Sequence, residues 1–401
     1  MKKIITKLAA AITTLSLCLG LAACSASETK ASDSSKGGDF KVGAIYINSQ
    51  NDTSGYTYAH HKGITTAMEE MNLSVSDDLF IVDNVPEDDE KVKAAIDTLA
   101  GKGCNIIFGI SFGYINAMDE AAKEYPDIIF SHATGYLSND TNFNNYFGRI
   151  YQARYLAGIA AGYKSLELQN NNIGYVSAWG TEYAETCSGI NAFTLGVRAV
   201  NPDAVTHVYE LQTWGDNEKE RQAAQILIDT YDCCVIAQHC DSAQPQLVAA
   251  EKGVFGCGYN SDMAVDAPAA HLTAPVWNWN VYYKLAMETA KNDPSNFMNA
   301  VGNYYGGLKE GFVDISPLTD NVPAAAADAI KSARELMISG EWDVFSGTAL
   351  KFDAEGNVQT VDAALKSNDG STIVEAGGVS VEDAVITGSM DYFVEGVIQD
   401  A

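Results

Sequence analysis

The sequence predicts an α/β protein with two doubly wound lobes that face each other across a cleft. The first observation is a β-turn-α unit that occurs three times in succession between residues 206 and 263. In each unit a short apolar run stops at polar and aromatic residues and gives way to apolar residues at helical spacing. The second observation is the same unit, repeated between residues 41 and 134. Because strands that alternate with helices form parallel sheets with right-handed crossovers, each block predicts one lobe.

The first lobe is expected to begin with a buried strand at residues 41–47, followed by a helix that contains His60 and His61. Further strands are predicted at residues 79–82, 105–108 and 128–130. Helices ending at Leu99 and Tyr125 separate these strands. A helix over residues 151–164 then leaves the lobe, because its apolar residues recur every three to four positions.

The second lobe is expected to open with a strand at residues 173–176 and to continue with the three units described above. Asn217 is a candidate N-cap for the helix of the first unit. From Asp266 onward proline and tryptophan residues predict that the chain crosses a hinge and returns to the first lobe. The remainder predicts a helix at 282–290, a strand at 311–315, a helix at 324–339 and a β-rich tail.

These elements divide the chain into five parts. The parts are a lipoprotein signal peptide (1–23), a lipidated cysteine with a flexible tether (24–39), lobe 1 (40–155 and 267–300), lobe 2 (156–266 and 301–350) and a C-terminal β-rich tail that packs on the lobes (351–401).

Polar and aromatic side chains follow the three strands of the second lobe. In parallel sheets ligands bind beyond the carboxyl ends of the strands. The first candidates for a binding site are therefore the side chains at those ends, namely Trp214, His239, Asp241, Asn260 and Asp262.

The N-terminus has the pattern of a bacterial lipoprotein signal. Lys2 and Lys3 form a basic region, residues 4–21 are apolar, and Leu21-Ala22-Ala23-Cys24 resembles a lipobox. The apolar stretch is short for a membrane span and contains polar residues. We therefore expect a lipid on Cys24, a tether after it, and a protein anchored at the extracytoplasmic face of the cell membrane.

Composition excludes some partners. The chain of 401 residues carries a formal net charge of −27, which makes binding to nucleic acid unfavourable. Four cysteines, at positions 104, 233, 234 and 257, begin or lie within expected buried strands, where a thiol serves as a small apolar group. We expect a monomer that binds no cofactor, and the pairing of cysteines is left open.

Eight segments together form a specific pattern. They are Gly55-Tyr56-Thr57-Tyr58-Ala59-His60, His132-Ala133-Thr134-Gly135-Tyr136, Arg154-Tyr155-Leu156-Ala157-Gly158, Gly189-Ile190-Asn191-Ala192-Phe193, Trp214-Gly215-Asp216, Gly258-Tyr259-Asn260-Ser261-Asp262-Met263, Val276-Trp277-Asn278-Trp279 and Met390-Asp391-Tyr392-Phe393-Val394-Glu395-Gly396-Val397. This pattern resembles the basic membrane protein family of ABC transporter substrate-binding lipoproteins, which is related to the purine nucleoside receptor, and especially its purine-base-binding branch. The resemblance implies a type I periplasmic-binding-protein fold, with two Rossmann-like lobes joined by three crossings, that supplies an ABC permease.

The resemblance also implies a purine held between two aromatic rings, which correspond here to Tyr56 and Trp214. Base edges with N–H donors need fixed acceptors, a role open to Asp262 and to Asp241 or Asn260. His60, His239, Phe112 and Trp277 complete the candidates for the ligand site. No phosphate-binding glycine loop is present, so a purine base or nucleoside is expected rather than a nucleotide.

Three segments depart from the family pattern. Residues 238–241 replace a glycine-rich loop of nucleoside-binding members, and residues 276–279 replace a ribose-binding lysine. Residues 179–183 replace a proline-rich loop of the base-binding branch. The choice between base and nucleoside, and between adenine and guanine, therefore stays open.

Single residues also allow other interpretations. Tyr58 could supply the ring in place of Tyr56, and Asp262 could be a helix N-cap. Residues 109–113 match G-x-S-x-G, the pattern of a serine hydrolase that would use Ser111. A zinc-binding receptor would use His60, His61, His239 and Asp241. A sensor that reports its ligand to a membrane kinase is a further alternative.

Overall fold

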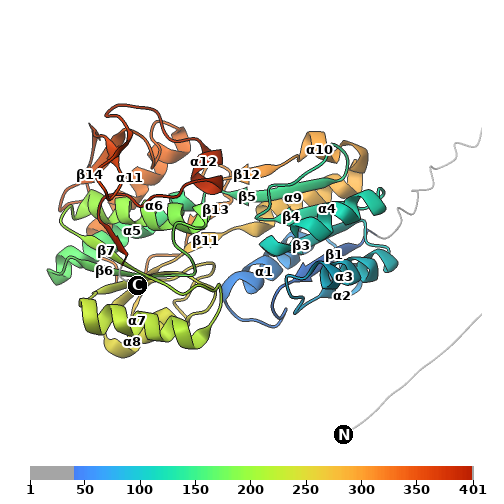
Figure 1. Cartoon of the computed structure of the whole chain (residues 1–401), viewed down its shortest axis with the longest axis horizontal. Helices are drawn as coiled ribbons and strands as arrows, with labels where there is room; N and C mark the ends of the chain where they lie inside the picture. The colour runs from blue at the N-terminus through green and yellow to red at the C-terminus, as the bar shows by residue number, and fades with distance from the viewer. Residues whose placement is uncertain (1–39, 400–401) are drawn as a thin grey trace, which may run out of the picture. The chain divides into compact units, whose positions relative to one another are not determined.

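The computed structural model describes residues 40–399, and the expected signal peptide, Cys24 and tether lie outside them. Two parallel sheets of six strands each form the framework of this part of the chain (Figure 1). Their strand orders are β12-β5-β4-β3-β1-β2 and β10-β9-β8-β6-β7-β18. The predicted α/β class and doubly wound topology are confirmed.

The first sheet follows the predicted units closely. Its strands are β1 (Val42–Tyr46), β2 (Leu79–Val82), β3 (Ile106–Ile110), β4 (Ile129–Ala133) and β5 (Phe143–Gly148). Its helices are α1 (Gly55–Glu70), α2 (Val75–Asp78), α3 (Asp89–Gly101), a 3-10 turn (Phe112–Tyr114) and α4 (Ile115–Glu124). Strands β1 and β3 are fully buried, because helices cover both faces of the sheet.

The second sheet contains β6 (Asn172–Ser177), β7 (Val205–Glu210), β8 (Val235–His239), β9 (Phe255–Cys257) and β10 (His271–Thr273). Its helices are α5 (Ile150–Leu168), α6 (Ala184–Val200), α7 (Asn217–Tyr231) and α8 (Gln244–Lys252). The N-cap of α7 is Asp216 and not Asn217, because Asp216 keeps an extended backbone while its carboxylate accepts from the amides of Glu218 and Lys219 at 3.1 Å.

The chain passes between the two sheets three times: from β5 into α5, from β11 (Pro275–Trp277) into α9 (Trp279–Asn292), and from β12 (Tyr304–Gly306) into β13 (Val313–Ile315). Strands β11 and β13 pair antiparallel at this crossing. Helix α9 packs against α1 of the first lobe.

Three boundaries of the predicted lobes differ in the structure. Strand β12 lies within the range expected for lobe 2 but pairs with β5 of the first sheet. Helix α5 begins at Ile150, within the range expected for lobe 1, and packs on α6. In the expected tail, β18 (Val397–Gln399) joins the second sheet beside β7. Strands β12 and β18 are each only three residues long. Such short segments carry little local pattern, so their pairing depends on partners far along the chain.

The remaining elements divide between the two lobes. The 3-10 turn (Pro294–Asn296) and α10 (Phe297–Ala300) pack with α9 in the first lobe. In the second lobe α11 (Ala324–Ser339) packs on α5, whereas β14 (Thr348–Phe352) and α12 (Asp383–Gly388) pack on α6. The other C-terminal strands are β15 (Val358–Asp362), β16 (Leu365–Lys366) and β17 (Thr372–Val374). Strands β14 and β15 form one hairpin and β16 and β17 another.

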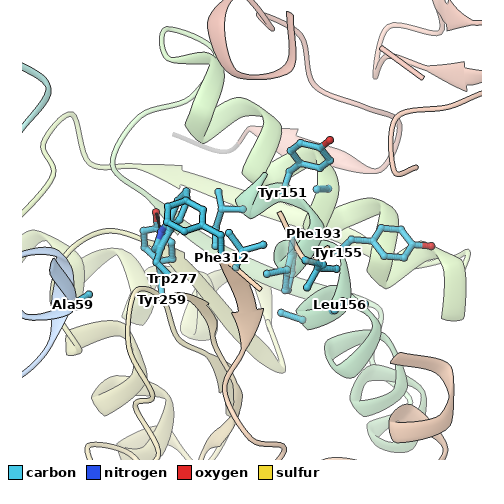
Figure 2. Packing of buried hydrophobic residues seen from close by; sticks show 14 of the residues in the cluster. Ala59, Tyr151, Tyr155, Leu156, Phe193, Tyr259, Trp277 and Phe312 are labelled. Carbon is cyan, nitrogen blue, oxygen red and sulfur yellow. Dashed lines mark hydrogen bonds between the residues drawn. The ribbon is translucent and has the colours of Figure 1, made fainter. Parts of the chain in front are cut away.

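Close packing of α5 on α6 forms the centre of the hydrophobic core (Figure 2). A methyl group added at Gly158 would lie 2.2 Å from the Phe193 carbonyl oxygen, and one at Gly196 would lie 2.1 Å from that of Tyr155. Only glycine allows the two backbones to approach this closely. All six cysteines of residues 40–399 are buried, as expected for small apolar groups. Within the same residues no helix has the length and apolar character of a membrane span.

Candidate ligand-binding site

A cavity of about 680 Å³ lies where the carboxyl ends of the two sheets meet, a volume within the range of small-molecule sites. The loops after the strands of the first sheet contribute one wall and those of the second sheet the opposite wall. The lining side chains that bear on function are Tyr56, Glu87, Phe112, Thr134, Asn145, Tyr183, Glu185, Trp214, His239, Asp241, Tyr259, Asn260, Trp277 and Trp279.

Aromatic rings from both sides surround this cavity. Tyr56 lies in the first turn of α1 and Phe112 follows β3, whereas Tyr183 and Trp214 follow β6 and β7. The Tyr183 ring lies 5.7 Å from that of Trp214 and 6.5 Å from that of Phe112, so it bridges the two walls. At the crossing, Trp277 and Trp279 stack with their ring centroids 4.5 Å apart.

Carboxyl groups give the cavity an acidic character. Burial, together with the negative charges of Glu220, Glu185 and Asp52, raises the pKa of Asp241 to about 8. Asp241 is therefore largely protonated at neutral pH and offers an O–H donor as well as acceptors. Its backbone amide donates to the Trp214 carbonyl at 3.0 Å, which joins the loops after β8 and β7.

His239 is a neutral imidazole at neutral pH. Burial and the nearby positive charge of Arg154 lower its pKa to about 4, although the Glu185 carboxylate acts in the opposite direction. The two side chains are 3.4 Å apart, from Nε2 of His239 to Oε1 of Glu185. The pair therefore presents a neutral ring and a carboxylate on the same wall.

Asn260 has a buried polar side chain on the cavity wall. It is 2% exposed, and neither its amide nitrogen nor its amide oxygen has a hydrogen-bond partner among the described residues. Its φ of 65° is in the left-handed region, and its backbone amide donates to the Pro275 carbonyl at 3.1 Å. A buried polar group without a partner costs about 1 to 3 kcal/mol. This side chain is thus positioned to bind a group that offers both an acceptor and a donor.

Seven of the nine predicted site residues lie on the cavity wall: Tyr56, Phe112, Trp214, His239, Asp241, Asn260 and Trp277. His60 and Asp262 do not.

His60 lies behind the wall. Its ring stacks on Trp279 at 3.9 Å, and its Nδ1 is 2.6 Å from the Tyr283 hydroxyl. Burial lowers the pKa of His60 well below its usual value, so it is a neutral core residue.

Asp262 faces solvent with a side chain that is 47% exposed, and its carboxylate accepts from the Ala264 amide at 3.0 Å. No helix among the described residues starts there, so it is not an N-cap. Its carboxylate also lies 3.5 Å from Nε2 of His271. The backbone turns at Asn260, which has a left-handed φ. The Asn260 side chain is buried at the cavity wall, whereas the Asp262 side chain lies on the solvent side.

Several lining residues are not among those predicted from the sequence. Tyr183 and Glu185 follow β6 in the same way that Trp214 follows β7, so the rule for carboxyl ends of strands could have found them. Tyr305 on β12 and Ala384, Thr387 and Gly388 of α12 also line the cavity, but they follow no predicted strand and this rule does not find them.

The geometry at Ser111 is not that of a hydrolase. Its hydroxyl donates to Glu87 Oε1 at 2.5 Å, and the Gly113 amide donates to the same oxygen at 2.8 Å. His132 contacts the Ser111 backbone carbonyl, at 2.8 Å, and not its hydroxyl. The zinc-binding alternative is not supported either. Within residues 40–399, no three His, Cys, Asp or Glu side chains are grouped so that they could hold a metal ion.

Comparison with known proteins decides the family. The family model described as ABC transporter substrate-binding protein PnrA-like matches residues 40–345. The chain belongs to this family. A purine-binding protein of Brucella abortus is 33% identical over 89% of this chain and 92% of its own length. A putative ABC transporter glucose-binding protein of Haloferax volcanii is also 33% identical, over 80% of this chain and 78% of its own.

Solved structures agree on the fold. An ABC transporter solute-binding protein from Aeropyrum pernix superimposes with a TM-score of 0.61 at 14% identity, over 79% of this chain and 94% of that one. An ABC transporter solute-binding protein from Conexibacter woesei superimposes with a TM-score of 0.59 at 18% identity, over 76% of this chain and 98% of that one. The protein is therefore an extracytoplasmic substrate-binding protein, not an enzyme, with a small-molecule ligand and an ABC permease as partner.

Proposed function

We propose that this substrate-binding protein binds a purine base, adenine-like in its hydrogen bonding, or a purine nucleoside, and delivers it to its permease. The observation that carries the proposal is the buried carboxamide of Asn260 in a cavity lined by aromatic rings from both sheets.

The aromatic rings suit a flat heterocycle. Stacking of a base on an aromatic side chain contributes about 1 to 3 kcal/mol per base. Because Tyr56 and Trp214 come from opposite walls, a purine between them would gain both contacts only when the walls approach each other. Ligand binding and closure of the cleft would then be one event.

The carboxamide of Asn260 suits the edge of the same heterocycle. An asparagine side chain accepts from an exocyclic N–H and donates to the neighbouring ring nitrogen of adenine. The neutral Asp241 carboxyl can serve as a further donor or acceptor. Glu185 and Glu182 on the wall would repel a phosphate, which favours a base or nucleoside over a nucleotide.

A hexose is the second candidate. The relative named as a putative glucose-binding protein is as similar to this chain as the purine-binding one. Carboxylates such as Glu185 accept hydrogen bonds from sugar hydroxyls as readily as from base N–H groups.

Thermal unfolding tests these candidates. Soluble protein that starts at Ser25 is unfolded, refolded to remove bound ligand, and heated with adenine, adenosine, guanine, guanosine, cytosine, glucose or zinc. A ligand at about 100 times its Kd stabilises the fold by roughly 2.7 kcal/mol. A rise in Tm with purines supports the proposal, whereas a rise with glucose or zinc alone overturns it. Uptake of radiolabelled purine by cells distinguishes an importer from a sensor.

We also propose that Cys24 carries the lipid anchor, on the sequence pattern of residues 21–24. Radiolabelled palmitate should enter the full chain in bacterial cells and should not enter a Cys24→Ser variant. Equal labelling of both would overturn the proposal.

A further inference from the structure

Part of the cavity wall comes from a segment beyond the family match. The match ends at residue 345, yet Ala384, Thr387 and Gly388 of α12 line the cavity. These three positions share one face of the helix, because residues three and four apart are neighbours. On another side of α12, Ile386 is fully buried in the core. The C-terminal segment is thus fixed in place with one face toward the ligand site.

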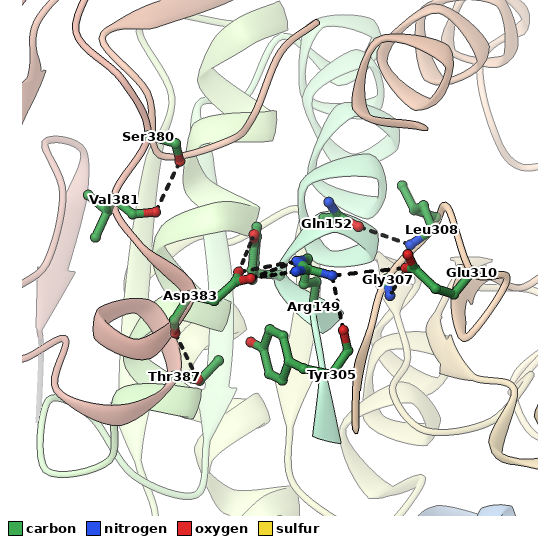
Figure 3. A network of polar contacts seen from close by, with 11 residues as sticks. Arg149, Gln152, Tyr305, Gly307, Leu308, Glu310, Ser380, Val381, Asp383 and Thr387 are labelled. Atoms are coloured by element: carbon green, nitrogen blue, oxygen red, sulfur yellow. Dashed lines mark hydrogen bonds and ion pairs between the residues drawn. The ribbon is translucent and has the colours of Figure 1, made fainter. Parts of the chain in front are cut away.

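Arg149 holds this helix through its first residue (Figure 3). Its Nη2 and Nε lie 2.6 and 2.9 Å from Oδ2 of Asp383, and Nε lies 3.2 Å from Oδ1. The Tyr151 hydroxyl donates to the same carboxylate at 3.1 Å. Two-pronged arginine–carboxylate contacts fix orientation as well as distance.

The same arginine also belongs to the crossing between the sheets. Its backbone amide donates to the Gly306 carbonyl at 2.7 Å, and its Nη1 donates to the Tyr305 carbonyl at 3.1 Å. Its guanidinium lies 5.1 Å from the centre of the Tyr305 ring, which lines the cavity. Arg149 therefore joins α12 to the crossing strand β12 (Figure 3).

We propose that α12 is a specificity wall of the ligand site, which limits how far a ligand extends, and that the Arg149–Asp383 pair is its positioning pair. The inference rests on the proposed function only for the choice of probes. A ligand that extends past the aromatic rings toward α12 meets this wall, so a nucleoside is more sensitive to its position than a base.

Gly388 allows a direct test. A Cβ added at Gly388 meets no atom within 4 Å, and the same holds for Gly101. Both glycines end a helix, α12 and α3 respectively, but only Gly388 lines the cavity. Gly388→Phe should therefore weaken adenosine binding by about tenfold or more and adenine binding less, whereas Gly101→Phe should change neither.

Calorimetry with adenine, adenosine and glucose gives the outcome. The variants are compared using whichever probes bind the unmodified protein, so a failure of the purine proposal is seen separately. If Gly388→Phe binds every such probe as tightly as Gly101→Phe does, the wall is refuted.

A second pair of variants tests the positioning role. Asp383→Asn removes the charge at α12, and Glu395→Gln removes a comparable charge that binds Arg198 at 3.1 Å, away from the cavity. We expect Asp383→Asn to raise the ligand dissociation rate several-fold and to change the adenosine-to-adenine affinity ratio, with Glu395→Gln unchanged. Equal dissociation rates and ratios in the two variants would reduce the pair to a structural contact and refute this role.

Discussion

Replacing Trp214 with alanine tests the aromatic recognition of the ligand most directly. The side chain lies on the cavity wall after β7 and is not part of the buried core of residues 40–399. Its backbone carbonyl, which accepts from the Asp241 amide, is unaffected by the substitution. The variant should therefore fold normally and lose the stacking contribution of about 1 to 3 kcal/mol, which weakens purine binding roughly 5-fold to 150-fold.

The control for this change is Trp179→Ala. The Trp179 ring also packs near Tyr183, at 5.2 Å, but does not line the cavity. Isothermal titration calorimetry should show a loss of affinity for Trp214→Ala and little change for Trp179→Ala. Unchanged affinity in Trp214→Ala, or an equal loss in both, would refute the assignment of the ring to the ligand.

Three further predictions concern the same cavity. Asn260→Gly keeps the left-handed φ of 65° and removes two unpaired polar atoms. Ligand affinity should therefore fall at least about tenfold, whereas the Tm of the protein without ligand should not fall in parallel. A parallel fall in Tm would contradict a ligand role. Gly55 has a φ of 84°, and Gly55→Ala places a methyl group 2.1 Å from the Asp241 carbonyl oxygen across the cleft. The cleft should therefore close less completely, and ligand affinity should fall. Small-angle scattering with ligand should show a larger radius of gyration than for the unmodified protein. Asp241 has a pKa raised from 3.8 to about 8, so the folded state holds its proton longer than the unfolded state and stability falls as pH rises through that interval. His239, with a pKa lowered from 6.5 to about 4, acts in the opposite direction below pH 6.5, so the Asp241 effect should be clearest between pH 6.5 and 8. Asp241→Asn should flatten the loss of Tm in that window, and an unchanged slope would refute the raised pKa.

The sequence by itself determined the fold class and most of the elements. Apolar runs such as the one at β2 (Leu79–Val82) and the helical pattern of α11 (Ala324–Ser339) match the structure at both ends, because period and capping are local properties. The rule that ligands bind at the carboxyl ends of parallel strands also placed Trp214, Asp241 and Asn260 on the cavity wall. These residues were identified because their position follows from chain direction alone.

Only the tertiary structure decided which neighbours of those residues face the ligand. His60 lies one turn of α1 beyond Tyr56, yet its ring is held behind the wall by Trp279 and Tyr283. Asp262 is two residues beyond Asn260, yet the left-handed backbone turns it toward solvent. The direction of a side chain depends on a single φ or on a packing partner far along the chain, and neither leaves a pattern in the sequence.

The contribution of the C-terminal segment was decided in the same way. The pairing of β12 with β5 and of β18 with β7 joins residues more than 150 positions apart. The ion pair between Arg149 and Asp383 spans 234 positions and brings α12 to the cavity. Periodicity and motifs describe neighbours along the chain, whereas this wall of the site exists only because distant segments share one core.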